Sequence, residues 1–421
     1  MKTFLRPILI LVVAASLAST FAGQTPPQPK QEKLLNGLKI LMWPDASAKM
    51  VGVRIRIHSG SSFDPQGREG VMKMLAENIF PETAAREFFT EDLGGKLEIV
   101  ATYDYIEINA MAKPENFISA LETLSAAVAS PTIDKPTTEK LRSALLTSVA
   151  ALEADPAYVA DQAVTKRLFG TFPYGRPQLG SAESIRKIDF ADLLDAKQRF
   201  LTGDNATVAV YGNFDRTLGF RAIRRLFGAW LKSDKRVPST FRQPDPVPSA
   251  FLTVPSPKAD VNAVRFAFRG TTRNDKEFAA SRVFTNILDA RLKARVAAEH
   301  AASVFVRNEP HILPGVIIIG LGGQKSSNVN GKVEANEIVG KVLTDAITDA
   351  EFAAAKRIFQ AEWSRRDVYS FWLDADTFRT IGPEADSRIA DAVTLEDVRA
   401  YASRAAKQPM AAVLVNTPAA N

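Results

Sequence analysis

Lys73 and Glu77 stand four residues apart in the segment GVMKMLAENIFPET (70–83), where the spacing of side chains is most suggestive of chemistry. Apolar residues recur every four positions from Val71 to Ile79, which predicts a helix. Two histidines on one helix face, four residues apart, could hold zinc. A lysine is a poor substitute, because removing its proton at pH 7 costs about 4.6 kcal/mol before any metal is bound.

Ala76, between these two residues, cannot act as a general base because its methyl group accepts no proton. The sequence offers no replacement centre, since it contains no cysteine and no G-x-S-x-G segment. GLGGQKSS (320–327) lacks the G-K-[ST] ending of a phosphate loop, so we expect a turn after a strand there. The histidines His58, His300 and His311 do not pair at ligand spacing, so we expect exposed or hydrogen-bonded imidazoles.

The beginning of the chain has the pattern of a secretory signal peptide. MKTFLR is basic, an apolar run follows it, and small residues near position 22 predict a cleavage site. A membrane anchor is the alternative, but an uninterrupted apolar span of about 18 residues is missing. We therefore predict a signal peptide at 1–22, export to the periplasm, no transmembrane segment in the mature chain, and a proline-rich tether at 23–34.

Composition excludes some classes of function. The formal net charge of the 421 residues is +6, the basic residues are dispersed, and no nucleic-acid-binding motif is present. Without cysteine there can be neither disulfides nor zinc–thiolate sites. We therefore predict no nucleic acid partner and a fold that depends on its apolar cores.

The remaining chain divides into two similar pieces. A proline cluster predicts a linker at 234–258, between domains at 35–233 and 259–421. VRIRIH (53–58) and VRFAFR (264–269) alternate apolar with mostly polar residues, so each predicts a half-buried strand. The shared order of strands and helices indicates an internal duplication. We expect an α+β fold with two homologous domains, each a mostly antiparallel sheet with helices packed on one face.

Segments along almost the whole mature chain resemble the pitrilysin/insulinase family, the inverzincin metallopeptidases that include the subunits of mitochondrial processing peptidase. The matching pieces are NGLKI (36–40), HSGSSFD before the motif helix, EDLGGKLEIVATYDY (91–105), FPYGRPQLGSAESI (172–185), VAVYGNFD (208–215), and in the second piece RNDKEFAASRVFTNILDARL and DAEFAAAKRIFQ. Their occurrence in the family's order implies the pitrilysin-like (LuxS/MPP-like) fold.

The resemblance places Lys73 and Glu77 at the two histidine positions of the family's H-x-x-E-H motif. Ala76 falls at the catalytic glutamate, and Ser148 falls at the third metal ligand. The resemblance therefore implies a zinc-free member with a degenerate motif, no metal and no catalytic base. We hypothesise that Lys73 and Glu77 form an ion pair where zinc would have been bound, the alternative being a solvated helix face.

Members of the family bind peptides at a sheet edge, and the resemblance carries this role to the strand Glu98–Thr102. Glu98 replaces the family's usual asparagine, and Asp104 matches its aspartate. Arg291 falls at the position of a substrate-binding arginine, although it could equally be an exposed helix charge. Phe305 lies beside the position of the family's substrate-binding tyrosine and supplies only a ring.

The function that this combination implies is an exported, non-catalytic subunit. Its partner would be a homologous subunit that carries zinc, and the two would enclose a chamber for a peptide substrate. Two alternatives stay open: a protein that binds and holds peptides alone, and a metallopeptidase whose site is not recognised here.

Overall fold

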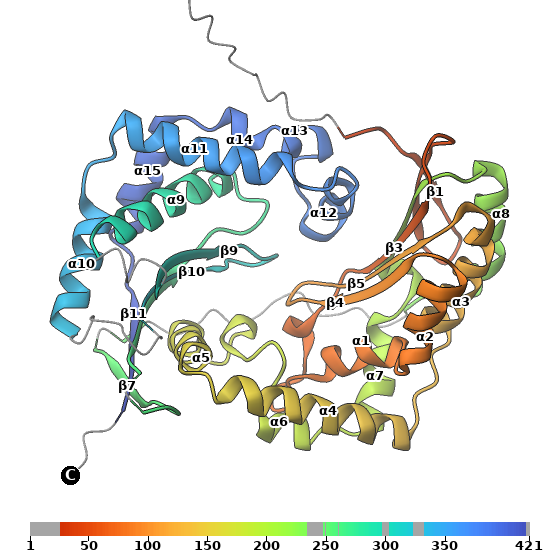
Figure 1. Ribbon diagram of the computed structural model, residues 1–421, viewed down its shortest axis with the longest axis horizontal. Helices are drawn as coiled ribbons and strands as arrows, with labels where there is room; N and C mark the ends of the chain where they lie inside the picture. Colours follow the sequence, from red (N-terminus) through yellow and green to blue (C-terminus); the bar gives the residue numbers. More distant parts are fainter. Residues whose placement is uncertain are drawn as a thin grey trace, which may run out of the picture.

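The computed structural model describes residues 26–233, 247–248, 250–259, 261–296, 303–322 and 332–417. The predicted signal peptide, His300 and much of the predicted linker lie outside these residues. The chain forms two halves that face each other, which we call the first half (residues up to 233) and the second half (residues from 247) (Figure 1). None of the described helices is long and apolar enough to cross a membrane.

The first half contains a six-stranded sheet in the order β1-β2-β6-β3-β5-β4. β2 and β6 run parallel, and the other neighbouring strands are antiparallel. β1 falls within the predicted tether, so the end of that segment is a paired edge strand. The strands are β1 (Lys30–Lys33), β2 (Lys39–Pro44), β3 (Val51–Ile57), β4 (Lys96–Ala101), β5 (Ile106–Ala112) and β6 (Ala206–Gly212).

The second half repeats this topology in the order β7-β11-β8-β10-β9. β7 runs parallel to β11 as β2 does to β6, and the other pairs are antiparallel. The predicted duplication is therefore present strand by strand, with β7 as the counterpart of β2. β7 lies where the sequence analysis placed the linker. The strands are β7 (Leu252–Pro255), β8 (Ala263–Arg269), β9 (Val304–Glu309), β10 (Val316–Gly322) and β11 (Ala411–Asn416).

The helices of each half cover one face of that half's own sheet, as the sequence predicts (Figure 1). Several begin with an aspartate whose carboxylate accepts backbone N–H groups of the first turn, which satisfies donors that the helix itself leaves free. Those of the first half are α1 (Val71–Ile79), α2 (Thr83–Glu87), α3 (Phe117–Ala129), α4 (Lys135–Glu153), α5 (Pro156–Phe169), α6 (Ala182–Arg186), α7 (Phe190–Phe200) and α8 (Arg216–Phe227). Those of the second half are α9 (Phe278–Ala294), α10 (Lys332–Thr344), α11 (Asp349–Ser364), α12 (Ser370–Phe378), α13 (Pro383–Ser387), α14 (Ile389–Ala392) and α15 (Leu395–Ala405).

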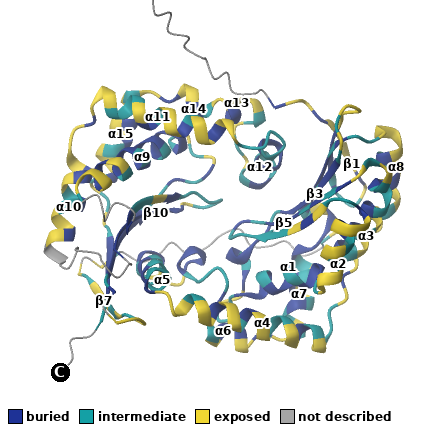
Figure 2. Ribbon diagram, viewed as in Figure 1, coloured by how far each residue is buried: buried dark blue, intermediate teal, exposed yellow. Residues whose placement is uncertain are grey.

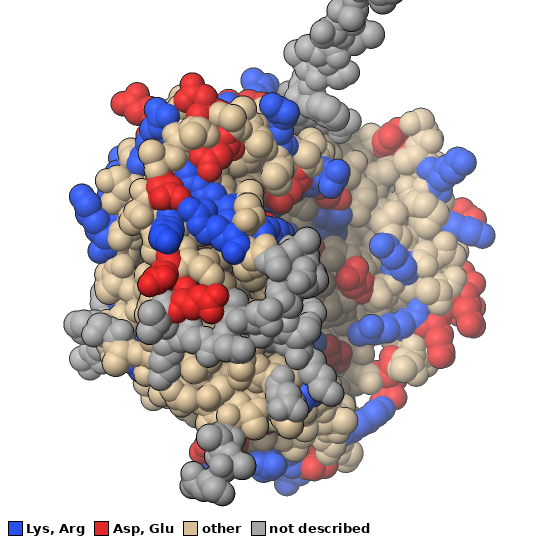
Figure 3. All heavy atoms as spheres, turned by 60° about the vertical axis from the view of Figure 1, so that its left-hand side comes forward, with Lys and Arg blue, Asp and Glu red and all other residues tan. Residues whose placement is uncertain are grey.

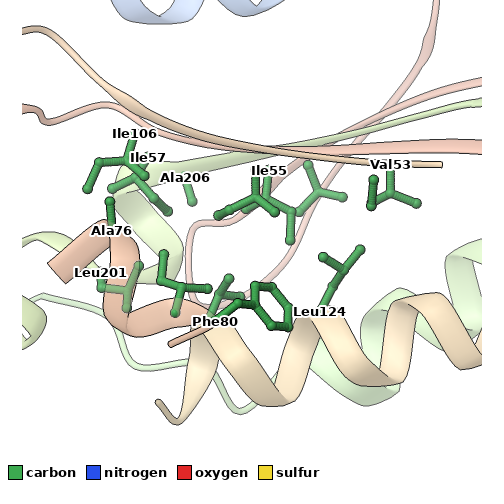
Figure 4. Packing of buried hydrophobic residues seen from close by; sticks show 14 of the residues in the cluster. Val53, Ile55, Ile57, Ala76, Phe80, Ile106, Leu124, Leu201 and Ala206 are labelled. Carbon is green, nitrogen blue, oxygen red and sulfur yellow. The ribbon is translucent and has the colours of Figure 1, made fainter. Parts of the chain in front are cut away.

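Each half has its own apolar core between its sheet and these helices. In the first half, Val53, Ile55 and Ile57 point from β3 towards the helices, and Leu124 of α3 packs beneath them (Figure 4). Figure 2 shows buried residues along both sheets and on the helix faces turned towards them. Burial of alternate strand residues therefore explains how each sheet and its own helices hold together.

The two halves also exchange a helix. α5 of the first half packs on the second sheet, where Val164 and Leu168 join a cluster with Val413 of β11. In return, α12 of the second half packs on the first sheet, where Trp372 lies with Trp43 of β2. Each sheet is therefore covered on both faces, once by helices of its own half and once by a helix of the other half (Figure 1).

This exchange corrects the prediction that the two alternating strands are half-buried. Arg56 of β3 and Arg265 of β8 are only 2% and 1% exposed, although both lie at polar positions of the pattern. Arg56 binds Asp374 of α12 at 2.7 Å, and Arg265 binds Asp161 of α5 at 2.6 Å. The polar faces are therefore interfaces between the halves, where each arginine meets an aspartate on the exchanged helix.

Candidate functional site

The motif helix α1 is fixed at its start by Asp64. The Asp64 carboxylate accepts the backbone N–H groups of Gly70 at 2.8 Å and Met72 at 2.7 Å, and burial raises the pKa of Asp64 to about 7. Gly70 has φ 109°, a left-handed conformation that favours glycine. The apolar face of α1 packs on the sheet, so Lys73 and Glu77 lie on the opposite, partly exposed face.

Lys73 and Glu77 form the ion pair that we hypothesised. Lys73 Nζ lies 2.6 Å from Glu77 Oε1, and a guanidinium nitrogen of Arg86 lies 3.7 Å from Glu77 Oε2. Ala76 is fully buried, and its methyl group points to Ile57 and Ile106 of the sheet (Figure 4). The position that the resemblance assigns to the general base is therefore part of the apolar core.

Ser148 does not join this group. It is exposed on α4, and its hydroxyl donates to the carbonyl of Ala144 in the same helix at 3.1 Å. Zinc needs imidazole, thiolate or carboxylate ligands in a near-tetrahedral arrangement, and Glu77 is the one such group among the four motif positions. These residues do not fit zinc. The described part of the chain also holds no group of three His, Cys, Asp or Glu placed to bind a metal.

His58, at the end of β3, is hydrogen-bonded through both ring nitrogens, in agreement with the sequence analysis. Nδ1 lies 2.9 Å from Thr377 Oγ1, and Nε2 lies 3.0 Å from Thr207 Oγ1. Burial lowers the pKa of His58 to about 4, with a further lowering by Arg56 and Lys39 that Asp376 opposes. His58 therefore stays neutral near pH 7 and joins the two halves.

β4, the strand expected to receive a peptide, is at the edge of its sheet. The outward groups at its two ends are occupied: the Gly95 N–H donates to the Phe89 carbonyl, and Gln178 donates to the Ala101 carbonyl at 2.7 Å. Because outward and inward groups alternate along an antiparallel strand, the N–H and C=O groups of Leu97 and Ile99 also point outwards. Among the described residues no hydrogen bond to these groups is found. A short stretch of this edge is therefore unpaired among the described residues.

Glu98 and Phe305, two of the side chains predicted to contact substrate, lie in different surroundings. Glu98 is exposed on β4, beside the open edge. Phe305 is partly buried on β9, and the guanidiniums of Arg265 and Arg307 lie 4.9 and 5.3 Å from its ring centroid. The substrate contacts proposed for Glu98 and Phe305 stay predictions.

Arg291 is buried, so it is not the exposed helix charge that the sequence analysis gave as the alternative. It is 7% exposed, and all five of its N–H donors are engaged within the second half. Its partners are both carboxylate oxygens of Glu351 and the carbonyls of Val342, Asp345 and Ala346. The guanidinium therefore ties α9 to the end of α10, the start of α11 and the segment between them, and it has no donor left for a peptide in this conformation.

The halves also touch through the tips of two corresponding hairpins, a contact that the sequence analysis missed. Asp104, in the turn between β4 and β5, binds His311 Nδ1 at 2.7 Å and accepts the Ile312 N–H at 3.1 Å in the turn between β9 and β10. The Tyr174 hydroxyl donates to Asp104 at 3.1 Å and accepts the Leu313 N–H at 3.2 Å. Asp104 and His311 are far apart in sequence, so no local pattern indicates their pairing.

Two cavities lie beside this contact. One, of about 340 Å³, is lined by residues that include Tyr103, Asp161, Gln178, Arg307, Glu309 and His311, and we call it the acidic cavity. The other, of about 370 Å³, is lined by residues that include Arg56, Arg273, Arg282 and Arg366, and we call it the arginine cavity. Figure 3 shows a recess between the halves, and on the face drawn there basic and acidic side chains are interspersed.

Comparison with known proteins agrees with this architecture. The family model described as insulinase (peptidase family M16) matches residues 39–182, and the model described as the peptidase M16 inactive domain matches residues 187–359. Both halves of the chain thus match models of one peptidase family. The chain belongs to the insulinase family, peptidase family M16.

Individual relatives are distant. The chain is 24% identical over 284 residues to a protein named as a probable mitochondrial-processing peptidase subunit beta of Arabidopsis thaliana, covering 66% of this chain and 53% of that protein. It matches a solved peptidase M16 inactive domain from Pseudomonas fluorescens with TM-score 0.78 and 21% identity, covering 94% and 99% of the two chains. It matches the periplasmic protease PqqL of Escherichia coli with TM-score 0.68 and 15% identity, covering 93% of this chain and 48% of PqqL. The chain spans about half the length of the curated relatives it matches.

Proposed function

We propose that this chain is an exported, non-catalytic subunit of an M16-type peptidase, paired with a homologous subunit that carries zinc. The observation that carries the proposal is the Lys73–Glu77 ion pair at the metal motif, next to the buried Ala76. The Lys73 ammonium is bound to the Glu77 carboxylate, which is the one group at the four motif positions that could still bind zinc. Hydrolysis would therefore depend on a metal and a base supplied by the partner.

The contribution of this chain to the pair would be peptide binding. The outward N–H and C=O groups of Leu97 and Ile99 can bond an extended peptide through its main chain, which tolerates many side-chain sequences. Glu98, Arg291 and Phe305 remain proposed contacts, with Arg291 the weakest because its donors are already engaged. The half-length match to relatives such as PqqL is consistent with a second, similar unit completing the chamber.

Export to the periplasm is part of the proposal and rests on the signal-peptide pattern of residues 1–22. It can be tested separately, by fractionating cells that express the full chain and sequencing the amino terminus of the mature protein. A chain that keeps its first 22 residues inside the cell would contradict export.

The decisive experiment combines metal analysis with hydrolysis assays on the mature chain, alone and with a co-expressed H-x-x-E-H homologue. We expect no stoichiometric zinc and no hydrolysis from this chain alone, and hydrolysis faster for the pair than for the homologue alone. A Glu→Gln change at the partner's general base should abolish the activity of the pair, whereas Lys73→Ala in this chain should leave that activity unchanged. One tightly held zinc in this chain, or chelator-sensitive hydrolysis by it alone, would overturn the proposal.

A stand-alone peptide-holding protein is the second candidate, because the edge of β4 is open in the single chain. It predicts that the chain binds unfolded peptides without a partner and protects them from aggregation. Peptide affinity that is the same with and without the homologue, together with an unchanged hydrolysis rate, would favour this candidate.

A further inference from the structure

The arginine cavity is lined from both halves and reaches the turn that follows β4. Tyr105 lies in that turn, one position before Ile106, which pairs with Ala101 of β4. On the second half, Pro310 of the turn between β9 and β10 lines the same cavity, as do residues of α9, α11 and α12. The cavity therefore adjoins the edge strand that we propose binds a peptide.

Cations and carboxylates are equal in number around the arginine cavity. The guanidiniums are those of Arg56, Arg273, Arg282 and Arg366 on the walls and of Arg54, which binds the lining Ser370; the carboxylates are those of Glu107 and Asp374 on the walls and of Asp367, Asp386 and Glu362, which bind these arginines. With five groups of each sign, the total charge favours neither an anion nor a cation.

The accessible charges on the walls are nevertheless cations. The side chains of Arg366 and Arg282 are 30% and 25% exposed, whereas those of Glu107 and Asp374 are 10% and 5% exposed. The more exposed carboxylates around the cavity belong to residues that do not line it. Because Coulomb energy falls with distance, a ligand in the cavity interacts most strongly with the guanidiniums nearest to it. The cavity therefore favours an anion.

Three side chains on the walls have donors left for such an anion. Arg366 donates through Nη2 to Asp374, and its Nη1 has no hydrogen bond to any described residue. The Ser370 hydroxyl accepts from Arg54 Nη1 at 3.0 Å, so its own proton stays available for donation. The Tyr105 hydroxyl likewise has no hydrogen bond to any residue that the structure describes.

Arg366 is oriented by aromatic rings. Its guanidinium carbon lies 4.6 Å from the ring centroid of Trp363 and 5.3 Å from that of Phe371. Contact of this kind holds the flat guanidinium by its face and leaves the N–H groups at its edge for acceptors. An oxygen that binds Arg366 Nη1 therefore needs neither a new side-chain position nor the loss of the bond to Asp374.

We propose that the arginine cavity binds a carboxylate of a peptide through Arg366, with the hydroxyls of Ser370 and Tyr105. This inference rests on the proposed peptide-binding function and adds to it a preference for acidic peptides. A carboxylate supplies acceptor oxygens only, and its hydrogen bonds to a guanidinium are stronger than those between neutral groups. The group can be the carboxyl terminus of the peptide or the side chain of an aspartate or glutamate.

The test uses the mature chain and an eight-residue peptide that has two glutamines, no charged residue and an uncharged fluorophore at its amino end. The peptide is prepared as a carboxyl-terminal amide, with a free terminal carboxylate, and as the amide with both glutamines replaced by glutamate. Fluorescence anisotropy gives the three dissociation constants. We expect at least one carboxylate form to bind about tenfold more tightly than the neutral amide at pH 7, as for one hydrogen bond to a charged group. The form that does so identifies the source of the carboxylate.

Two variants locate the effect. Arg366→Gln removes the guanidinium and should reduce the tenfold preference to about twofold or less, and Tyr105→Phe removes one hydroxyl and should reduce it to about fivefold or less. Both should leave the affinity of the neutral amide unchanged. Arg295→Gln is the matched control and should keep the preference, because Arg295 is 29% exposed and also binds an aspartate, but lies beyond the far end of α9, about 25 Å along that helix from the cavity. Thermal melting checks that each variant is folded, and Tyr105→Phe decides if Arg366→Gln is not.

The outcomes separate this inference from the proposed function. Equal binding of the neutral and both carboxylate peptides would overturn the carboxylate site and leave peptide binding intact. A preference that survives both variants, or one that Arg295→Gln reduces as much as Arg366→Gln does, would reflect the overall charge of the chain and overturn the site too. Failure of all three peptides to bind would overturn the peptide-binding function together with this inference.

Discussion

At the scale of single residues, the three motif positions on α1 contribute to the helix and to the apolar core. Lys73 and Glu77 satisfy each other's charge across one turn, and Ala76 adds to the core instead of opening a polar hole in it. Each of these residues therefore stabilises α1 through its own contacts. An Ala76→Glu substitution alone would bury a carboxylate against Ile57 and Ile106.

The strength of the Lys73–Glu77 pair can be measured with a double-mutant cycle. Lys73→Ala, Glu77→Ala and the double variant should give a coupling of about 0.2–0.5 kcal/mol in the free energy of unfolding, because both side chains are partly solvated. Urea denaturation followed by circular dichroism provides the values. A coupling above about 1 kcal/mol would mean that the pair is more than an exposed helix pair.

The pair was predictable because its partners are four residues apart on one helix, so local geometry decides the contact. The pairing of Asp104 with His311 was not predictable in this way. The two residues lie on hairpins of different halves, and they meet when both sheets are in place. From the sequence, His311 was simply an isolated histidine.

At the scale of elements, alternation of residue types predicted the strands correctly but misjudged what covers them. The polar positions of β3 and β8 indicated a solvated face, whereas α12 and α5 cover these faces and bring aspartates to the arginines. No periodicity within 53–58 or 264–269 can report a helix that lies about a hundred residues or more away along the chain.

Asp374 is the centre of this interface, so its removal should be costly. Burial would raise the pKa of Asp374, but the guanidiniums of Arg366, Arg56 and Arg273 outweigh it and hold the pKa below its ordinary value. Asp374→Asn leaves buried arginines without this partner and should cost about 3–5 kcal/mol in the free energy of unfolding, measured by urea denaturation.

Asp367→Asn is the matched control for this substitution. Asp367 precedes α12 and binds Arg54, but its side chain is 35% exposed, so the cost should be about 0–1 kcal/mol. Equal effects of the two substitutions would contradict the assignment of Asp374 as the centre of the interface.

The corresponding edge strands of the two sheets, β4 and β9, differ in whether their outward N–H and C=O groups are hydrogen-bonded. On β9 the outward Val306 N–H is occupied by the Asp289 carboxylate of α9, and Arg282 donates to the Asn308 carbonyl. On β4 the corresponding groups of Leu97 and Ile99 have no such partner among the described residues. Side chains of α9 therefore occupy outward groups of β9, and this protects that edge from strand pairing in a way that β4 lacks.

Ile99→Pro tests this difference. Proline removes an outward N–H without removing a bond to β5, so peptide affinity should fall about two- to tenfold, as for one hydrogen bond. Ile99→Ala shortens the side chain but keeps the N–H, and it should bind as the parent chain does. Fluorescence anisotropy with a labelled peptide compares the three proteins. A loss of affinity that is the same in both variants would point to the side chain instead.

At the scale of the whole molecule, the exchanged helices make the two halves one folding unit. Separation of the halves would expose the apolar faces of α5 and α12 and also the sheet faces that they cover. It would also break the ion pairs of Arg56 with Asp374 and of Arg265 with Asp161. We therefore infer that this chain moves as one body, so that in the proposed pair of subunits any large opening would take place between the two subunits.

This inference predicts that the halves need no covalent connection. Residues 26–233 and 247–421, co-expressed as separate chains, should co-purify as a one-to-one complex that melts in a single transition. Leu168→Asp, which places a charge on the buried face of α5, should release the two chains. Leu218→Asp should not, because Leu218 is 55% exposed on α8. If either half alone proves folded and monomeric in size-exclusion chromatography and amide exchange, the halves are independent and the single-body description fails.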